Sequence, residues 1–576
     1  MLPASQGACL WPAGRAPVTA SAQSRAPTRN VRSHTPVSRT PVPVSSAGPR
    51  PGAADRSGGR GFQQSRAVTA VIMAATLVGL GLRIYQLIRP GYLLGITEYD
   101  DGTDYGSAVR LIHGALPYRD FIMVQPTGIT ILMAPVALAT KGAGTVAGMA
   151  VARGLTALAS AAAIPLGGLL TRHRGFAATA VTCGILAVFP DSLQAARTVL
   201  LEPWLVLFCL LGALAMFDGD RLASRKRLIW GGLAFGFAGA VKVWAILPVL
   251  VLLGLVLIAR RPRDARGFGA GVAAGFCLPV LPFALLAPVT FYRSVIVAQL
   301  VRSDLVRVPA GLRLQHMLGL NHLPQLPTPA LIVIGAAVIA IIAGLCVLGW
   351  RLMHQSPPPL DWFATATLVL VVAAFLWPSD FYNHYAAFLA PFLALAIALP
   401  LSRVLTALRE SGARARAAVL VRRAASAAAV AVLVTFAVLQ GISESHLVAS
   451  IPPTEILAAR QAIPPGACVL SDTVSYTIAI NRFVSGTAGC SQMVDGVGSD
   501  YALSSGRNGL NGAGATPAVE QMWLSAFRSA QYLWLSSDSS RRIPWTPRLH
   551  AYVLAHFAPL TEGPDWLYVR QAQHSG

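Results

Sequence analysis

Three aspartates lie close together near residue 100, at Asp100, Asp101 and Asp104. A short amphipathic helix from about Thr103 to His113 would place the first two at its N-terminal end, where the helix dipole stabilises a negative charge. A carboxylate held there could act as a general base that takes a proton from a hydroxyl group. From composition alone, the simpler interpretation is a solvated acidic loop in which Asp101 caps the helix.

A second group of charged residues comprises Asp191, Arg197 and Glu202, and a lone Lys242 interrupts a later apolar run. Arg197 and Glu202, opposite charges five residues apart, could simply form an ion pair at the entrance of a membrane span. A lysine in the middle of a bilayer costs about 2.5 to 3.5 kcal/mol on insertion scales, so we expect Lys242 at the outer interface or beside a partner. Snorkelling of its long side chain is one explanation, and contact with a phosphate group is the other.

Two later segments complete the set of candidate residues. The predicted outer loop at 288–329 contains Arg302 with Arg293, Arg307 and Arg313, which breaks the positive-inside trend and indicates a need for positive charge on the outer face. Tyr382 and His384 lie where another apolar segment begins. Aromatic belts explain the tyrosine, but they do not explain why Asp380, Asn383 and His384 lie together.

These residues are separated by long apolar runs. The chain has 576 residues, of which 54% are hydrophobic and 12% charged, and its formal charge of +22 comes from basic clusters between the runs. This pattern is typical of a polytopic membrane protein with positive cytoplasmic loops, and it argues against a nucleic-acid-binding protein. We place cytoplasmic clusters at 172–174, 221–227, 260–266 and 403–423. About eleven transmembrane helices then follow, at 67–88, 143–170, 176–190, 203–218, 228–241, 243–259, 268–287, 330–350, 362–377, 385–402 and 424–443.

The predicted fold is therefore an all-α polytopic membrane protein with a small extracytoplasmic α/β domain at its C-terminus. Residues 1–66 read as a disordered cytoplasmic tail, because they are rich in Arg, Pro and Ser and lack apolar periodicity. Residues 67–443 form the transmembrane domain, with a first outer loop at 89–142. Within that loop, 127–140 is too short to span and is predicted to be an interfacial or re-entrant helix.

The odd number of spans places residues 444–576 outside the cytoplasm. Short β-like runs at 467–471, 532–536 and 566–570, with helical patterns near 520–529 and 547–556, indicate the α/β domain. Cys468 and Cys490 lie in this segment, where a disulfide is chemically permitted, and we hypothesise that they pair.

In their order and spacing, several of these motifs resemble GT-C membrane glycosyltransferases, in the branch of protein O-mannosyltransferases and lipid A aminoarabinose transferases. Asp100-Asp101-Gly102, Gly114 and Pro117-Tyr118-Arg119-Asp120 look like the first outer loop of that family. Arg197-Thr198-Val199-Leu200-Leu201-Glu202 is similar to its Arg-x-x-Leu-Leu-Asp segment, and Lys242 matches a lysine of a later helix. The resemblance covers roughly residues 95–400.

The resemblance implies that Asp100 takes the position of the catalytic acidic residue and Asp101 that of its neighbour. Glu202 would be the second carboxylate, with Arg197 and Lys242 near the lipid phosphate. The chain departs from the family at Asp101, where many relatives have Glu, and at Gln125-Pro126-Thr127, which stands where many have a His-Pro-Pro-like element. The choice of base between Asp100 and Asp101 therefore stays open.

We expect an inverting transfer of a hexosyl or pentosyl group from a polyprenyl-phosphate donor to an acceptor hydroxyl on the outer face of the plasma membrane. The acceptor would be a cell-envelope glycan, lipid or protein. The N-terminus would be cytoplasmic and the C-terminus extracytoplasmic.

No cofactor is expected, and a divalent cation between Asp100 and Glu202 is the less favoured alternative. The rival functions are a flippase or transporter of lipid-linked sugars and a non-catalytic scaffold. The predicted site residues are Asp100 and Asp101 for catalysis and Arg197, Glu202, Lys242, Arg302, Tyr382 and His384 for substrate binding.

Overall fold

The computed structural model describes residues 54–259, 261–301, 307–378, 380–410, 431–504, 516–560 and 563–571. Contacts divide the chain into Met1–Ser57 and Gly58–Gly576, and apart from the first residues of α1 all elements below belong to the second unit. The predicted tail was wrong for residues 54–66, because helix α1 (Ala54–Leu87) already includes them. Nucleation is the unfavourable step of helix formation, and adding residues to an existing helix is easier. Because the apolar span already forms a helix, that helix extends into the polar residues before it. The rest of the predicted tail lies outside the described residues.

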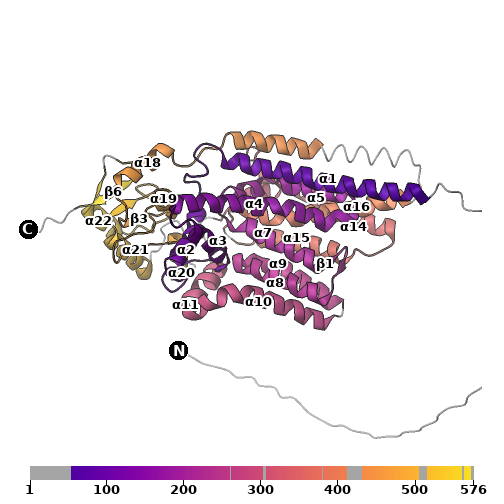
Figure 1. The fold of residues 1–576 in the computed structure, drawn as a ribbon, viewed down its shortest axis with the longest axis horizontal. Coiled ribbons are helices and arrows are strands. Elements are labelled where there is room, and N and C mark those ends of the chain that lie inside the picture. Colours follow the sequence, from indigo (N-terminus) through magenta and orange to yellow (C-terminus); the bar gives the residue numbers. More distant parts are fainter. Residues whose placement is uncertain are drawn as a thin grey trace, which may run out of the picture. The chain divides into compact units, whose positions relative to one another are not determined.

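The apolar runs form helices that lie side by side (Figure 1). Helices suit these runs because every backbone group within them is satisfied internally. The helices after α1 are α4 (Thr145–Thr171), α5 (Phe176–Val188), α6 (Pro190–Ala196), α7 (Leu201–Met216), α8 (Arg225–Val241), α9 (Ile246–Ile258), α10 (Pro262–Leu286), α14 (Thr328–Met353), α15 (Pro359–Leu376), α16 (Ala386–Glu410) and Ala431–Ser445.

Six helices among the described residues are long and apolar enough to cross a membrane, or seven if the bent pair α5 and α6 counts as one span. The chain is thus a multi-pass membrane protein. Helices α7, α8, α9 and Ala431–Ser445 occupy further predicted spans, but each has fewer than 18 described residues. The predicted total of eleven crossings therefore stays a prediction.

Basic segments that we predicted to share one membrane face lie close together. Arg174, in the short 3-10 helix η1 (Arg172–Arg174), pairs at 2.7 Å with both Asp220 and Asp361. Asp220 lies at the turn between β1 (Phe217–Asp218) and β2 (Arg221–Leu222), and Arg403 lies 3.9 Å from Asp361. The loops around residues 172, 220, 360 and 403 therefore meet at one end of the helices.

The first predicted outer loop forms two helices at the opposite end. Helix α2 (Tyr99–Ile112) starts four residues earlier than predicted, and α3 (Gly128–Ala139) occupies the predicted interfacial segment. The loop predicted at 288–329 contains α11 (Pro288–Phe291), the π-helix η3 (Tyr292–Val297), α12 (Ala298–Val301) and α13 (Ala310–Met317).

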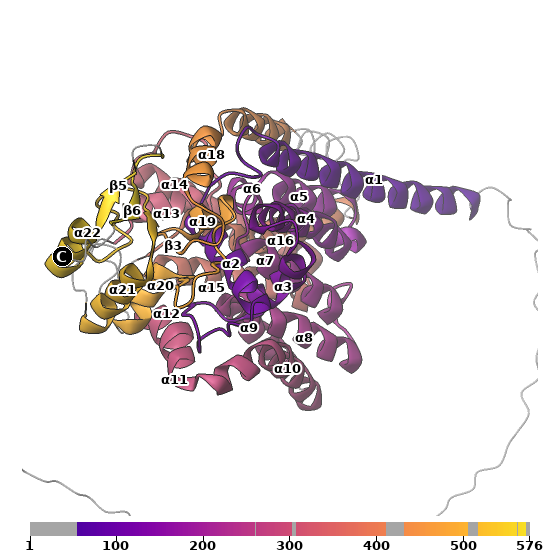
Figure 2. The same cartoon turned by 60° about the vertical axis from the view of Figure 1, so that its left-hand side comes forward.

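The segment after residue 446 holds a four-stranded sheet with helices around it, gathered at one end of the long helices (Figures 1 and 2). The strand order is β3-β4-β6-β5, with β3 and β4 parallel and the other neighbours antiparallel. Its core includes Trp523, Phe527 and Leu533. The elements are α18 (Pro453–Ala462), β3 (Val469–Leu470), α19 (Val474–Ala479), α20 (Gly496–Leu503), α21 (Pro517–Ser529), β4 (Tyr532–Trp534), α22 (Pro547–His556), β5 (Phe557–Pro559) and β6 (Leu567–Arg570).

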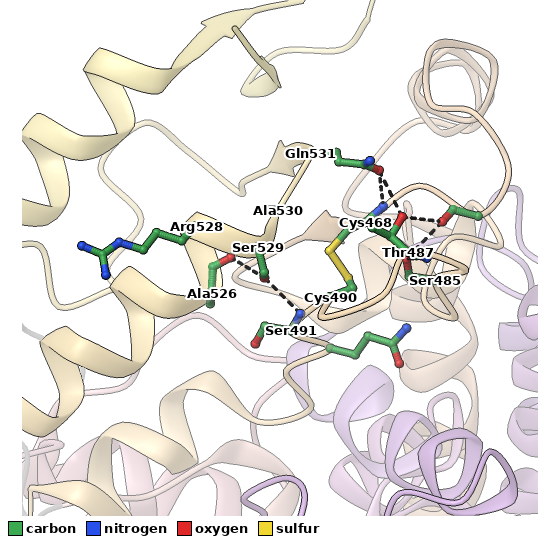
Figure 3. Close-up of a disulfide and its surroundings, with 12 residues drawn as sticks. Cys468, Ser485, Thr487, Cys490, Ser491, Ala526, Arg528, Ser529, Ala530 and Gln531 are labelled. Atoms are coloured by element: carbon green, nitrogen blue, oxygen red, sulfur yellow. Dashed lines mark hydrogen bonds between the residues drawn. A yellow bond between two sulfur atoms is a disulfide. The ribbon is translucent and has the colours of Figure 1, made fainter. Parts of the chain in front are cut away.

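The predicted strand runs and both predicted helices of this segment are present. Helices α21 and α22 are each preceded by a threonine and start with a proline, at Thr516-Pro517 and Thr546-Pro547. The threonine hydroxyl caps the helix by accepting a hydrogen bond from the backbone nitrogen three residues later, that of Val519 or Leu549. The hypothesised disulfide between Cys468 and Cys490 is confirmed, with 5.5 Å between the two Cα atoms. Figure 3 shows it beside Gln531, whose side chain accepts a hydrogen bond from the backbone of Cys468.

Candidate active site

A cavity of about 460 Å³ lies where α2, the starts of α7 and α16, the end of α8 and the C-terminal segment meet. No local stretch of sequence forms it, since its walls come from residues about 400 positions apart. Its charged lining residues are Glu98, Asp100, Asp104, Glu202, Lys242, His384, Asp495 and Arg542, with Tyr99, Tyr382, Tyr385 and Tyr501 between them.

Asp100 lies in the first turn of α2 with its side chain 46% exposed. Its Oδ2 is 4.0 Å from Nε2 of His384, which comes from the other side of the cavity. Helix α2 is held in place by α19, whose backbone approaches so closely that a Cβ at Gly102 would lie 2.3 Å from the nitrogen of Ser475. The Asp-Asp-Gly sequence thus combines an accessible carboxylate with a site of close backbone packing.

Asp101 points away from the cavity. Its carboxylate is fully buried, forms an ion pair with Arg153 of α4, and accepts a hydrogen bond of 2.8 Å from the backbone nitrogen of Val199. These contacts connect the start of α2 to α4 and to the Arg197–Glu202 segment. In this structure Asp101 faces Arg153 and the backbone of Val199 and does not line the cavity.

Glu202 and Lys242 form a buried ion pair, with 2.5 Å between Oε1 and Nζ. Glu202 lies in the first turn of α7, where the helix dipole favours a negative charge. Lys242 occupies the break between α8 and the short 3-10 helix η2 (Val243–Ala245), which leads into α9. Its Nζ lies 4.0 Å from the ring centre of Trp244 and 4.3 Å from that of Tyr385, so the expected partner for this lysine exists.

His384 lies between two carboxylates of the cavity, Asp100 and Glu202. It lies in the 3-10 helix η4 (Asn383–Tyr385) that leads into α16, and its Nε2 is 3.9 Å from Oε1 of Glu202 as well as 4.0 Å from Asp100. Tyr382 stacks nearly parallel to its ring at 5.8 Å. The segment with Asp380, Asn383 and His384, which aromatic belts did not explain, thus supplies an imidazole between Asp100 and the Glu202–Lys242 ion pair.

Arg197 does not line the cavity. Its guanidinium lies 3.8 Å from Glu98, and burial raises the pKa of Glu98 to about 7, although the positive charge of Arg197 acts in the opposite direction. The alternative pairing of Arg197 with Glu202 is not observed, because Glu202 pairs with Lys242. Asp191 pairs with His316 at 2.9 Å.

Two arginines of the loop at 288–329, Arg307 and Arg313, donate hydrogen bonds to backbone carbonyls of the protein. Arg313 donates to the carbonyl of Phe375 and Arg307 to that of Leu376. Both carbonyls lie at the C-terminal end of α15, where helix carbonyls lack intrahelical partners and cations are favourable. Arg302 lies outside the described residues, so its assignment as a substrate-binding residue stays a prediction.

The C-terminal segment contributes a wall that sequence reasoning missed. Asp495 accepts a hydrogen bond of 3.0 Å from the hydroxyl of Tyr99 and caps α20, and burial raises its pKa. Arg542 lies over the ring of Tyr99 and donates to Thr473. Neither residue has a local signal, because only tertiary packing brings it to α2.

The structure thus places Asp100, Glu202, Lys242, Tyr382 and His384 in one cavity, as predicted for a single site. Asp104, which is one helical turn after Asp100, was passed over as a site residue, although its spacing of four residues could have shown that it shares a helix face with Asp100. Within the described ranges, no three His, Cys, Asp or Glu side chains converge closely enough to hold a metal ion.

The chain is similar to known membrane proteins. A family model described as dolichyl-phosphate-mannose-protein mannosyltransferase matches residues 137–294. The structure of ArnT from Cupriavidus metallidurans in the apo state is 15% identical and has a TM-score of 0.50, with 89% of this chain and 98% of that chain covered. The structure of ArnT bound to undecaprenyl phosphate is 16% identical, with a TM-score of 0.51 and coverage of 88% and 98%. No curated protein matches the chain.

The fold shared with ArnT extends over nearly the whole of both chains, and the matched mannosyltransferase segment runs from α3 to the π-helix η3. The resemblance to the GT-C branch of O-mannosyltransferases and ArnT is thereby confirmed.

Proposed function

We propose that this protein is a membrane glycosyltransferase that moves a sugar from a polyprenyl-phosphate donor to an acceptor hydroxyl on the extracytoplasmic face. The observation that carries this proposal is the accessible Asp100 carboxylate opposite His384 and the buried Glu202–Lys242 pair, in a cavity of a fold similar to ArnT. ArnT has been solved with undecaprenyl phosphate. A lipid phosphate of the same kind is the donor carrier that we propose here.

The reaction is a single displacement. The acceptor oxygen attacks the anomeric carbon, the bond between that carbon and the phosphate oxygen breaks, and Asp100 takes the hydroxyl proton. The polyprenyl phosphate leaves as a monoester and gains one negative charge. Because one base on one side of the sugar supports one attack, the anomeric configuration inverts.

Hydrogen-bond donors and cations that are already in position stabilise the negative charge that develops on the leaving phosphate. Lys242 is held by Glu202 and two aromatic rings, and His384 lies within 4 Å of both carboxylates, so neither side chain has to reorganise during the reaction. Arg197 contributes through Glu98, and Arg302 is a further candidate. We propose no metal ion and no cofactor in this reaction.

The extracytoplasmic location of the cavity is supported by two features. The basic loops around Arg174 and Arg403 lie at the other end of the helices, as cytoplasmic loops would. The disulfide lies in the C-terminal segment that forms one wall, and disulfides persist in oxidising compartments. The acceptor that we propose is a cell-envelope glycan, lipid or protein.

Mass spectrometry of cell-envelope glycans and glycoproteins tests this function. A strain lacking the protein should lose one glycosylated product, and the wild-type chain should restore it. Asp100→Asn should lower the restored amount at least about 100-fold, as expected for the loss of a general base. Asp120→Asn is the matched control, because Asp120 lies in the same loop, pairs with Arg119 and does not line the cavity.

The outcomes separate the rival functions. A product restored equally by Asp100→Asn would contradict catalysis by this carboxylate and would favour a transporter or a scaffold. A lipid-linked sugar that accumulates on the cytoplasmic side of the mutant strain would identify a transporter.

A further inference from the structure

Among the described residues, two buried carboxylate oxygens of the cavity wall have no hydrogen-bond partner, Oε2 of Glu202 and Oδ2 of Asp104. Glu202 is paired with Lys242 through its other oxygen. Asp104 is only 3% exposed, and its Oδ2 has no hydrogen-bond partner within the part of the chain that the structure describes. The side chain lines the cavity. Other aspartates of this wall are satisfied, since Asp495 accepts from Tyr99 and from the backbone of Gly498.

The position of Asp104 follows from the geometry of α2. Residues four apart lie on one face of a helix, so Asp104 lies one turn deeper along the face that presents Asp100. Asp100 is 46% exposed at the mouth of this face, whereas Asp104 is enclosed. A ligand that brings an acceptor hydroxyl to Asp100 and an anomeric carbon beside it would fill the space next to Asp104.

Folding alone does not explain this carboxyl group. An unsatisfied buried polar group costs free energy, and native proteins tolerate such groups mainly where function needs them. Leucine has the same number of side-chain heavy atoms and the same branching, and it would carry no such cost. The arrangement therefore indicates that a ligand supplies the missing hydrogen bond.

The surroundings select a neutral hydrogen-bonding ligand. The charges that act on Asp104 come from Asp100, Glu202 and Asp495, which are acidic, and from Lys242, which already pairs with Glu202. A phosphate would be repelled by three carboxylates. A metal ion would need converging ligands, and none converge among the described residues. Burial raises the pKa of Asp104 well above its ordinary value and so favours the protonated form, which can both donate and accept a hydrogen bond.

We infer that Asp104 binds a hydroxyl group of the transferred sugar and so orients the anomeric carbon for attack. A hydroxyl is itself both donor and acceptor, which matches a neutral carboxylic acid. Since this role rests on the proposed function, Asp104 is a substrate-binding residue of the same cavity, distinct from the base Asp100 and from the phosphate contacts at Lys242.

Three measurements on the full-length protein test this role: the melting temperature in detergent, binding of undecaprenyl phosphate, and the restored glycosylated product in the complemented strain. Asp104→Leu should melt at the wild-type temperature or higher, because it removes an unsatisfied group. It should bind undecaprenyl phosphate with unchanged affinity, since this lipid carries no sugar. It should lower the product about tenfold to a hundredfold, the loss expected for one buried hydrogen bond.

Two further variants serve as controls. Asp104→Asn keeps one donor and one acceptor and should recover most of the lost product. Asp500→Leu changes another buried aspartate, one that accepts a hydrogen bond of 3.0 Å from Trp523 and does not line the cavity, and it should lower the melting temperature.

A lower melting temperature for Asp104→Leu, similar to that of Asp500→Leu, would show a structural role and overturn the inference. An unchanged amount of product would also overturn it, and lost binding of undecaprenyl phosphate would reassign Asp104 to the phosphate. If the wild-type chain restores no glycosylated product, the proposed function itself fails and this role fails with it.

Discussion

Asp100 and Asp101 have different environments because successive residues of an α-helix point about 100° apart. One carboxylate faces the cavity and the other faces Arg153 of α4. The sequence predicted that this pair would matter, but it left open which residue is the base. That choice depends on which face of α2 packs against α4, and this packing involves residues more than 50 positions away.

Asp101→Ala should destabilise the fold because it leaves the buried Arg153 without its ionic partner. Breaking one side of a buried ion pair costs about 3–5 kcal/mol. Thermal unfolding in detergent should show a clearly lower melting temperature for this variant and nearly none of that effect for Asp100→Asn. Equal melting temperatures for Asp101→Ala and the wild type would contradict the positioning role.

Glu98 should make stability depend on pH. Because burial raises its pKa from an ordinary 4.5 to about 7, the folded chain binds a proton more readily than the unfolded chain between these values. Stability contributed by Glu98 is therefore full below about pH 4.5 and is lost as the pH rises through about 7. Melting temperatures of Glu98→Gln and wild type should differ progressively in favour of the variant from pH 5 to pH 8. A difference that is constant with pH would rule this out.

At the scale of elements, polar residues mark the two places where the membrane helices break. Lys242 ends α8, and Arg83 of α1 donates to the carbonyls of Leu186 and Ala187 at the end of α5, just before the bend into α6. The break at Lys242 was predicted from charge placement. The role of Arg83 was not, since nothing in the sequence pairs it with α5. Likewise, α21 and α22 were predicted from their periodicity, whereas α19 and α20, with 6 and 8 residues, were too short to give a periodic signal. Helix α18 was not predicted, although it is as long as α22.

Arg83→Leu should weaken the bend between α5 and α6. The variant leaves carbonyls of α5 and the hydroxyl of Ser160 without their donor inside the helix bundle, at a cost of about 1–3 kcal/mol per unsatisfied group. Arg66→Leu, near the start of the same helix, is a matched control at a position outside the bundle interior. A lower melting temperature is expected for Arg83→Leu alone. Similar melting temperatures for both variants would contradict the role of Arg83 in stabilising the bend between α5 and α6.

Removal of the disulfide should loosen the C-terminal wall of the cavity. Cys468 and Cys490 close a loop with a sequence separation of 22, for which chain entropy gives about 3 kcal/mol. Under oxidising conditions, Cys468→Ser should therefore have a lower melting temperature than the wild type. A reductant should lower the melting temperature of the wild type toward that of the variant. An unchanged melting temperature in both comparisons would mean that the bridge contributes nothing.

At the scale of the molecule, the cavity around Asp100 depends on residues that are far apart in the sequence. The parity of basic clusters predicted that the loops at residues 100, 202 and 384 would share one face, and all three line the cavity. The sequence did not predict Asp495 and Arg542 in the same cavity, because a contact across nearly 400 residues leaves no local pattern. Their contacts with Tyr99 are seen only in the folded chain.

The shared cavity predicts that the first loop and the C-terminal segment lie on the same side of the membrane. Cysteines introduced at the exposed positions Arg119 and Arg548 should react with a membrane-impermeant thiol reagent in intact cells. A cysteine at Asp218, which is exposed beside the basic loops at the other end, should react only after permeabilisation. Reaction of Arg119→Cys and Arg548→Cys from opposite sides of the membrane would exclude a shared cavity.

We propose that Asp100 is the base that activates the acceptor hydroxyl for attack on a lipid-linked sugar donor. The most direct test of this proposal follows radiolabelled polyprenyl-phosphate sugars in membrane vesicles that contain the wild-type chain or Asp100→Asn. We expect the wild type to release one polyprenyl phosphate for each sugar that reaches the acceptor, and Asp100→Asn to do so at least about 100-fold more slowly. Transfer by Asp100→Asn at a rate close to that of the wild type, or transfer without release of polyprenyl phosphate, would contradict this mechanism.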